Sequence, residues 1–142
     1  MLEEKLILYL KKYKKEKGIY IITPRNNTIL KKICKNLSFE YTSNIAYIGK
    51  GNLTKSSDLY RRARQEMGWS NFRCATFVRK ISLYLELDIK DKSNLGLKEI
   101  TKKFILNNFN IKCIVLKEST DILEIEKKMI KKLHPCLNVK HK

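Results

Sequence analysis

The sequence has no run of about 18 consecutive apolar residues, which is the length that a helix needs to cross a bilayer. Residues 1–10 are acidic early, and they lack the charge order and the small-residue cleavage site of a signal peptide. The chain also has no internal repeat and no low-complexity tail. We therefore expect a folded cytoplasmic protein with no membrane-spanning helix.

Spacings typical of disulfide frameworks and metal sites are also lacking. The four cysteines are Cys34, Cys74, Cys113 and Cys136, and no two of them are close enough for a C-x-x-C pair. A disulfide framework is not expected in a cytosolic chain. A zinc site built from Cys136, His134 and His141 does not have the usual ligand spacing. We therefore expect the cysteines to be buried as small hydrophobic residues.

Acidic residues are scarce. There are 14 Asp and Glu against 31 Lys and Arg, which gives a formal net charge of +17. A field of this size favours polyanions such as DNA, RNA or an anionic membrane surface. Because no membrane segment is present, a nucleic acid is the leading class of partner. The plain alternative is a basic protein whose charge serves only solubility.

The hydrophobic pattern predicts an α+β domain over residues 1–142, in which helices surround a small sheet. Hydrophobic residues make up 43% of the 142 residues and fall mostly in short periodic runs. Strands are predicted over 18–23, 45–49 and 111–117. Helices are predicted over 2–16, 28–36, from Ser57 or Asp58 to about Met67, 71–85, 99–107 and from Asp121 to about Leu133.

The last predicted helix has one carboxylate on its apolar side. On a wheel of about 100° per residue, Ile122, Met129 and Leu133 form a stripe, and Glu126 falls in its middle. Glu124 points to the opposite face. A carboxylate buried without a partner is costly, so it must be paired, protonated or bound to a metal. Glu126 is therefore either a functional carboxylate, or a glutamate that reaches the domain edge or pairs with a structural lysine.

Arginines and aromatic residues are concentrated in one stretch of the chain. Five of the six arginines lie within residues 61–79, and four aromatic residues are interleaved with them or directly precede them, namely Tyr60, Trp69, Phe72 and Phe77. The arginine fork suits phosphate oxygens, and mixed arginine and aromatic surfaces suit nucleic acid. From Lys127 to Lys142 there are six lysines and no acidic residue. This pattern favours contacts with a phosphate backbone. The predicted nucleic-acid contacts are Arg61, Arg64, Arg73, Arg79, Lys80, Lys127 and Lys131.

Two tripeptides lie on the first two predicted strands. Gly18-Ile19-Tyr20 and Tyr47-Ile48-Gly49 spell the pair that names the GIY-YIG nuclease family. Further elements follow in the family's order: Lys50, the segment Asp58-Leu59-Tyr60-Arg61-Arg62, and Glu126 followed by Pro135 and Asn138. One tripeptide arises easily by chance, whereas five elements in order are specific. The sequence therefore resembles this family, which includes the nuclease domain of the UvrC excinuclease, over nearly its whole length.

The resemblance implies a small central antiparallel sheet of about three strands flanked by helices. It also implies cleavage of phosphodiester bonds in DNA with one divalent metal ion, Mg²⁺ or Mn²⁺, and no other small-molecule cofactor. Glu126 is then the only carboxylate ligand, and Arg62 holds the scissile phosphate. A single carboxylate is enough for Mg²⁺ because the ion keeps several waters.

The resemblance also gives roles to two tyrosines. Tyr20 and Tyr47 line the site, and one of them helps to activate the attacking water. A tyrosine with a pKa of about 10 is a poor base at neutral pH, so we expect Lys50, Arg62 and the metal to lower its pKa. Three further residues have structural roles, namely Gly18 and Gly49 for close backbone approach and Asn138 for fixing the last segment.

The sequence departs from compact family members in three places. A helical insert over 28–36 separates the two tripeptides, and Gly51 to Ser57 separates Lys50 from the arginine. The second departure makes Arg61 the alternative to Arg62 at the catalytic position. The segment 68–110 exceeds a minimal domain, and we interpret it as an elaboration of a core over 17–140 that follows the helix at 1–16.

Three other functions fit parts of the pattern. Asp88-Ile89-Lys90 and Glu126-Lys127-Lys128 each resemble the short acid-x-Lys element of restriction-type nucleases, although no suitable preceding aspartate is present. A nucleic-acid-binding module that has kept the fold without catalysis is a second alternative. A basic protein of the membrane surface is the third. The target sequence, the biological role and the oligomeric state cannot be predicted from these features.

Overall fold

A three-stranded antiparallel sheet forms the centre of the computed structural model, which describes residues 2–69, 75–85 and 95–139. Its strands are β1 (Gly18–Pro24), β2 (Tyr47–Gly51) and β3 (Phe109–Val115). The order is β2-β1-β3, and β1 pairs antiparallel with both neighbours. The central strand has the most β-branched and aromatic sequence, GIYIITP, as expected for a strand paired on both edges. The antiparallel sheet implied by the family resemblance is confirmed.

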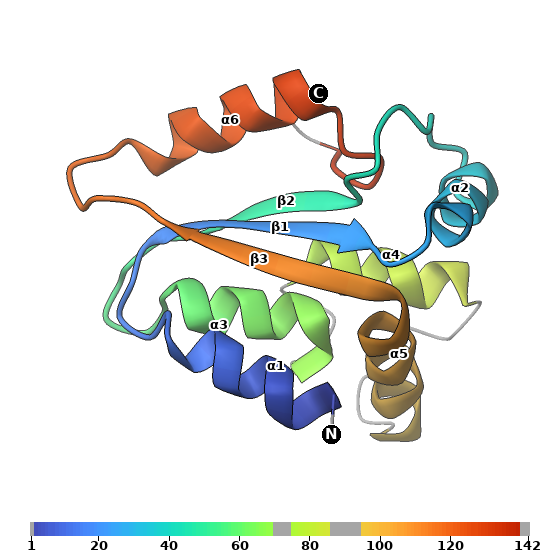
Figure 1. Cartoon of the computed structure of the whole chain (residues 1–142), viewed down its shortest axis with the longest axis horizontal. Helices are drawn as coiled ribbons and strands as arrows, with labels where there is room; N and C mark the ends of the chain where they lie inside the picture. The colour runs from blue at the N-terminus through green and yellow to red at the C-terminus, as the bar shows by residue number, and fades with distance from the viewer. Residues whose placement is uncertain (1, 70–74, 86–94, 140–142) are drawn as a thin grey trace.

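Helices cover both faces of the sheet (Figure 1). The last helix, α6 (Ile122–Leu133), lies alone on one face in this view, and most of the other helices lie on the opposite face. Those on the opposite side are α1 (Leu2–Lys11), α3 (Leu59–Arg64), α4 (Thr76–Tyr84) and α5 (Leu95–Asn108), while α2 (Asn27–Asn36) lies beside the end of β1. The predicted α+β class is therefore confirmed.

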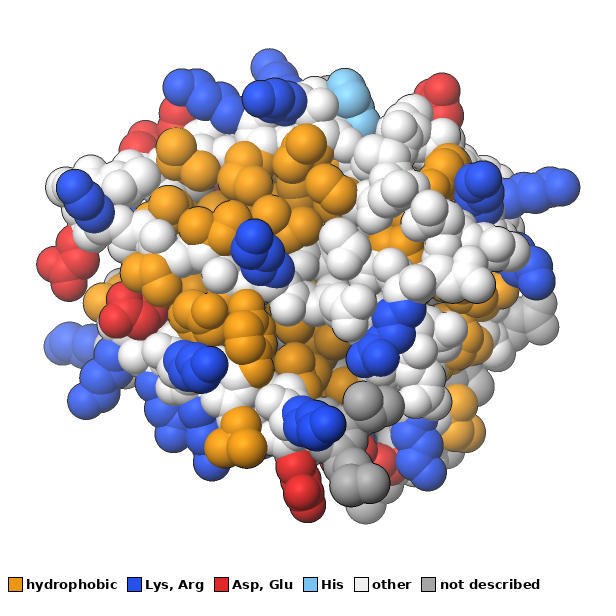
Figure 2. Space-filling view, viewed as in Figure 1, with side chains coloured by type: hydrophobic (Ala, Val, Ile, Leu, Met, Phe, Trp, Pro, Cys, Tyr) orange, Lys and Arg blue, Asp and Glu red, His pale blue; other side chains and the backbone are white. Residues whose placement is uncertain are grey.

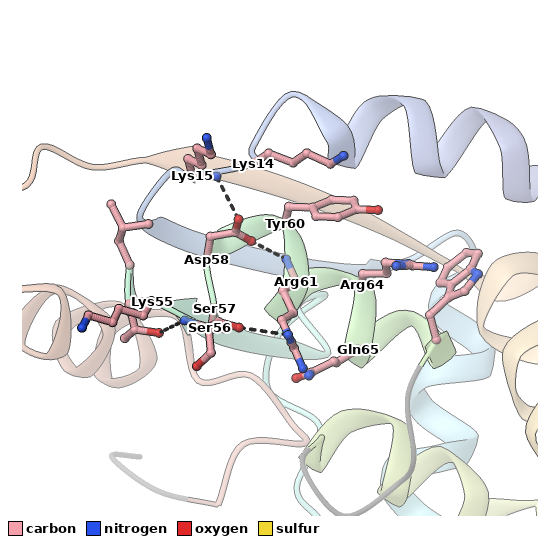
Figure 3. A pocket seen from close by; sticks show the side chains of 13 residues that line it. Lys14, Lys15, Lys55, Ser56, Ser57, Asp58, Tyr60, Arg61, Arg64 and Gln65 are labelled. Carbon is pink, nitrogen blue, oxygen red and sulfur yellow. Dashed lines mark hydrogen bonds between the residues drawn. The ribbon is translucent and has the colours of Figure 1, made fainter.

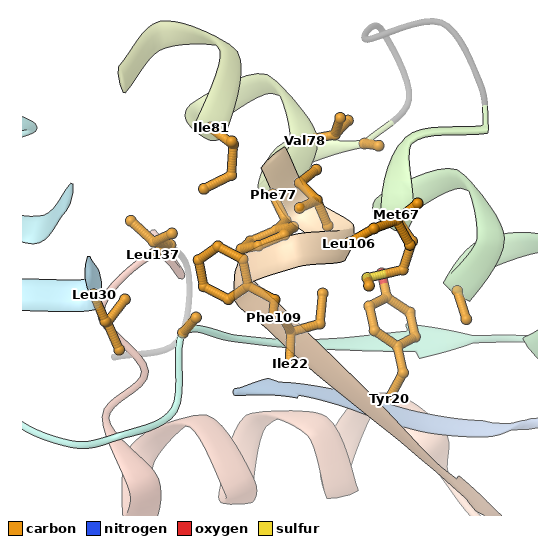
Figure 4. Packing of buried hydrophobic residues seen from close by; sticks show 14 of the residues in the cluster. Tyr20, Ile22, Leu30, Met67, Phe77, Val78, Ile81, Leu106, Phe109 and Leu137 are labelled. Atoms are coloured by element: carbon orange, nitrogen blue, oxygen red, sulfur yellow. The ribbon is translucent and has the colours of Figure 1, made fainter. Parts of the chain in front are cut away.

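Each face of the sheet has its own apolar cluster. Under α6, Ile122 and Ile130 pack with Ile19 and Ile48 of the sheet. The larger cluster lies on the other face, where rings and aliphatic side chains from β1, α4 and β3 meet (Figure 4). Phe77 and Phe109 contact edge to face at the centre of this cluster, with ring centroids 5.1 Å apart. The sheet is therefore fixed from both sides, and only its outer strands present free edges.

Several predicted helix boundaries shift in the structure. The first helix ends at Lys11 and continues only as turns, with Lys15 at a φ of 60°. The helix predicted to reach about Met67 is α-helical only to Arg64, and it ends in a wide turn, η1 (Gln65–Trp69), that contains Gly68 at a φ of 108°. The helix predicted over 99–107 begins earlier, at Leu95. The last helix begins where predicted, because the Asp121 carboxylate accepts a hydrogen bond from the Glu124 N–H.

The expectation of unpaired cysteines was wrong for two of the four. Cys34 of α2 forms a disulfide with Cys136 of the C-terminal segment, and both residues are fully buried. The two lie 102 residues apart in sequence, so no local spacing could reveal the pair. Because Cys136 is bonded to Cys34, it is not free to act as a ligand in the zinc site considered above. His141, another residue of that site, lies outside the described residues. Cys113 is free and buried, as expected, and Cys74 lies outside the described residues.

The basic residues are spread widely over the surface. In the view of Figure 2, lysines and arginines surround an apolar area between α6 and the β3 edge, and acidic side chains are few. Among the described residues, each helix is too short or too polar to cross a bilayer.

Candidate active site

A groove of about 760 Å³ lies at the free edge of β2. Helix α6 borders it from one face of the sheet, and α3 and α4 border it from the other. This groove is lined by all five of the predicted catalytic residues, namely Tyr20, Tyr47, Lys50, Arg62 and Glu126. They come from two strands and two helices, so only the folded chain brings them together.

The first tyrosine depends on the second glycine of the motif pair. Register places Tyr20 of β1 directly opposite Gly49 of β2. A Cβ at Gly49 would lie 2.2 Å from the Tyr20 hydroxyl oxygen, and a Cβ at Gly18 would lie 2.0 Å from the Ile114 carbonyl oxygen. Both distances are far below van der Waals contact. Gly18 therefore allows the Ile114 backbone to approach closely, and Gly49 makes room for the Tyr20 ring.

Glu126 occupies the buried side of α6, as the helical wheel predicted. The residue is 7% exposed, whereas Glu124 is exposed. Its Oε1 lies 3.2 Å from Nζ of Lys50, whose side chain is 36% exposed. The carboxylate is thus held at the groove by an ion pair with the lysine that follows the second tripeptide.

A second buried carboxylate, Glu66, was not predicted as a site residue. It is 1% exposed, and its Oε2 accepts a hydrogen bond from the Tyr20 hydroxyl at 2.9 Å. Its Oε1 accepts from the backbone N–H of Phe77 at 3.0 Å. Burial raises the pKa of Glu66 to about 7, although the Tyr20 hydrogen bond and the charge of Arg62 act to lower it. Glu66 therefore titrates near neutral pH directly behind the site.

The two tyrosines differ in exposure and surroundings. Tyr20 is 1% exposed, while Tyr47 is partly exposed and stacks on it, with centroids 6.4 Å apart. Burial raises the pKa of both tyrosines well above the ordinary value, and the nearby Glu66 raises both further. The charge of Arg62 lowers the pKa of both tyrosines, as expected, but by less than burial raises it. The lowering of a tyrosine pKa by Lys50, Arg62 and a bound metal together stays a prediction.

Neighbouring arginines on α3 face different sides of the helix. Arg62 lines the site groove and donates from Nη1 to Oε1 of Gln65 at 2.9 Å. Arg61 lines another groove and donates from Nη1 to the Ser56 carbonyl at 3.0 Å. Of the two arginines left open by the sequence, Arg62 is the one that shares a groove with Tyr20, Tyr47 and Glu126.

Asn138 joins the C-terminal segment to the edge strand. Its Oδ1 accepts from the Ile48 N–H, and its Nδ2 donates to the Ile48 carbonyl, both at 2.8 Å. Asn138 is 5% exposed and also lines the groove. It therefore pairs with the otherwise free backbone edge of β2 and closes one side of the site.

The predicted nucleic-acid contacts divide among different surfaces. Arg79 and Lys80 of α4 line the site groove, and burial lowers the pKa of Lys80. Arg61 and Arg64 line the other groove beside α3. Lys127 and Lys131 of α6 line neither groove, and Arg73 lies outside the described residues. The restriction-type alternative is not supported on α6, because Lys128 is exposed and lines neither groove; Asp88-Ile89-Lys90 lies outside the described residues.

The donor set of the groove suits a hard cation bound through few protein ligands. Within residues 2–69, 75–85 and 95–139, no group of three or more His, Cys, Asp or Glu side chains is gathered as a metal cage. One carboxylate, Glu126, faces the groove, and the volume leaves room for waters and a phosphate. Mg²⁺ typically binds in this way, through one or two carboxylates with several waters retained. The residues present therefore fit a single-carboxylate Mg²⁺ or Mn²⁺ site.

Residues 18–142 match the family model described as the GIY-YIG catalytic domain, and the chain belongs to this family. Comparisons with curated proteins and with solved structures gave no match. Membership of a family of catalytic nuclease domains indicates a nuclease whose substrate is a nucleic acid.

Proposed function

We propose that this protein is a divalent-metal-dependent endonuclease that hydrolyses phosphodiester bonds in DNA. The observation that carries the proposal is the single groove at the β2 edge, which is lined by Tyr20, Tyr47, Arg62 and Glu126. These side chains supply the groups that phosphodiester hydrolysis needs: a carboxylate for a cation, a guanidinium for a phosphate and hydroxyls for proton transfer.

Glu126 is the residue that would hold the metal, which is Mg²⁺ or Mn²⁺. When bound, the ion supplies positive charge beside the phosphoryl oxygens and the leaving group. Lys50 pairs with the carboxylate at a distance of 3.2 Å and holds it at the groove. Because Lys50 contacts only Oε1 in this ion pair, the other carboxylate oxygen is the better ligand.

Arg62 binds the phosphate at the centre of the groove. Its guanidinium can make paired hydrogen bonds to two phosphate oxygens and can neutralise charge that develops on them. The bond from Nη1 to Gln65 orients the guanidinium before DNA binds. Such preorganisation favours the transition state, because no reorientation is needed during the reaction.

We infer that Tyr47, once its hydroxyl proton has passed to solvent, acts as a phenolate that takes the proton of the attacking water, and that Tyr20 supports its ring. This assignment rests on exposure, since Tyr47 is partly exposed at the groove whereas Tyr20 is 1% exposed with its proton donated to Glu66. Stacking of the two rings holds Tyr47 in place. Burial, Glu66 and Glu126 raise the pKa of Tyr47, and a hydrogen bond with the Thr76 side chain and the charge of Arg62 lower it by less. Positive charge from an ion held by Glu126 would favour the phenolate form of Tyr47.

Basic side chains around the groove bind the DNA backbone. Arg79 and Lys80 lie at the groove itself, and Lys127 and Lys131 extend the positive surface along α6. Arg73 belongs to the same set by its sequence. These contacts supply affinity without sequence readout, because phosphate contacts position the protein and do not distinguish bases.

A cleavage assay tests the proposal directly. Supercoiled plasmid and labelled duplexes are incubated with the protein in Mg²⁺, in Mn²⁺ or in EDTA. We expect nicking or cutting in either metal and none in EDTA, and a loss of at least about 100-fold in Arg62→Ala. Absence of cutting on every DNA form, with salt-sensitive binding retained, would instead indicate a nucleic-acid-binding module that has kept the fold.

A further inference from the structure

A second groove, of about 700 Å³, lies on the other side of α3 from the site (Figure 3). Its walls come from three segments: the turn after α1, the loop 52–57 after β2, and the exposed side of α3 with Trp69 beyond it. We call it the α3 groove. The residues proposed to be catalytic do not account for it, since Arg62, Tyr20 and Glu126 all line the site groove.

The α3 groove is strongly positive. Five of its side chains are cationic, namely Lys14, Lys15, Lys55, Arg61 and Arg64, and one is acidic, Asp58. Both carboxylate oxygens of Asp58 are already engaged, because they accept from the backbone N–H groups of Lys15 at 2.9 Å and Arg61 at 2.8 Å. Asp58 is therefore used in local structure, and its one negative charge leaves the five cations of the groove in clear excess.

Aromatic rings hold part of this charge in place. Nζ of Lys14 lies 5.3 Å from the centroid of the Tyr60 ring, and the guanidinium carbon of Arg64 lies 5.8 Å from the same ring. Nε of Arg64 is buried and has no hydrogen-bond partner among the described residues. A buried donor left without a partner is unfavourable, because it has lost its hydrogen bonds to water. An anionic oxygen that draws the guanidinium into the groove would remove this cost.

The α3 groove adjoins the site groove. Thr54 and Ser57 line both of them, so the loop after β2 forms their shared wall. Helix α3 then presents Arg62 to the site and Arg61 with Arg64 to the second groove. A strand that passes the site over this loop would meet a second row of cations directly.

We propose that the α3 groove binds the phosphodiester backbone of DNA adjacent to the cut, on one side of the cut only. The occupant is a polyanionic chain and not a single phosphate, because the cations are spread along a groove that adjoins the site. The inference rests on the proposed function for the position of the cut, although DNA binding by the α3 groove can be measured without cutting.

Binding measurements in EDTA test the inference separately from catalysis. DNA molecules are lengthened one nucleotide at a time, first at one end and then at the other, and their affinities are measured between about 50 and 200 mM salt. For the wild type, we expect affinity to rise with extension at one end more than at the other. Arg61→Ala/Arg64→Ala should lose this gain, bind the longest DNA about tenfold more weakly, and show a salt slope smaller by roughly 1.5.

Two further variants make the result specific. Lys32→Ala/Lys35→Ala removes the same charge from α2, which lines neither groove, and it should keep the asymmetric gain. Lys14→Ala/Lys55→Ala changes exposed lysines of the groove and should lose the gain even if the arginine variant folds poorly. The inference is overturned if both groove variants respond to extension as the α2 variant does. If the wild type shows the asymmetric gain but cuts no DNA in metal, the groove stands and the proposed nuclease function fails.

Discussion

The Tyr20 hydroxyl donates a hydrogen bond to Oε2 of Glu66 over 2.9 Å, inside a region where both residues are 1% exposed. The direction of this bond fixes the Tyr20 proton away from the groove and turns the ring toward Gly49 and Tyr47. Glu66 is itself fixed by the Phe77 N–H. The tyrosine pair is thus anchored to the protein interior by one carboxylate.

Substitution of Glu66 by glutamine should change the pH dependence of cleavage. Ionised Glu66 accepts a hydrogen bond from the Tyr20 hydroxyl. Protonated Glu66 is itself a donor, so its proton competes with the hydroxyl proton of Tyr20 for the position between the two oxygens. Because burial raises the pKa of Glu66 to about 7, we expect the wild-type rate to rise with pH through neutrality. The charged and titratable groups that face Glu66 are Tyr20, Tyr47 and Arg62. Glu66→Gln should cut about 10 to 100 times more slowly at pH 8 and lack this rise.

Single-turnover rates from pH 5.5 to 9 provide the measurement, with DNA affinity measured in parallel. An unchanged pH profile in Glu66→Gln would contradict the role of Glu66 in the site. A loss of DNA binding equal to the loss in rate would point to a purely structural effect.

The same carboxyl group should make stability depend on pH. The folded pKa, about 7, is above the unfolded value of about 4.3, so the folded state binds the proton more tightly. Stability from this group is complete below the unfolded pKa and is lost as pH rises to about 7. The difference in unfolding free energy between Glu66→Gln and the wild type should therefore shift by about 3 kcal/mol in favour of the variant as the pH rises from 4 to 8.

Urea unfolding of both proteins at several pH values measures this difference. The comparison with Glu66→Gln removes the titration of all other carboxylates. A difference that stays constant from pH 4 to pH 8 would show that Glu66 titrates at an ordinary pKa.

Removal of the Asn138 amide should destabilise the protein and loosen the edge of the site. The side chain makes two hydrogen bonds of 2.8 Å to the backbone of Ile48, whose residue is fully buried. Asn138→Ala leaves both backbone groups without that partner, so we expect a loss of about 2–4 kcal/mol of unfolding free energy. Asn52→Ala is a matched control, because Asn52 is exposed at the groove. Equal unfolding midpoints in urea for the two variants would contradict this role.

Glu126 could be predicted from the sequence because a regular helix keeps its angular period. Helix α6 runs unbroken from Ile122 to Leu133, so a wheel places Glu126 correctly on the buried side. The sheet followed from the same kind of local pattern, since Gly18–Pro24 has strongly β-branched sequence and a proline at its end. The family motifs added the groove neighbours, which periodicity alone does not bring together.

Glu66 could not be found by a wheel, because the helix that carries it changes its period. The α-helical part ends at Arg64, and the wide turn Gln65–Trp69 rotates Glu66 toward Tyr20. The i,i+4 spacing from Arg62 to Glu66 is a signal only in a regular α-helix, and the change of period after Arg64 removes it. The Cys34–Cys136 bond was missed for a different reason, because its partners meet only through the packing of α2 against the C-terminal segment.

The comparison of Glu126→Gln with Glu124→Gln measures the central claim most directly. Both substitutions remove one negative charge from α6, but only Glu126 is buried at the groove and paired with Lys50. In single-turnover DNA cleavage with saturating protein and Mg²⁺, we predict that Glu126→Gln loses at least about 100-fold in rate with DNA binding retained. Glu124→Gln should cut within about twofold of the wild type, as expected for an exposed residue. Equal cleavage rates for the two variants would contradict the assignment of Glu126 as the metal-binding carboxylate of this nuclease.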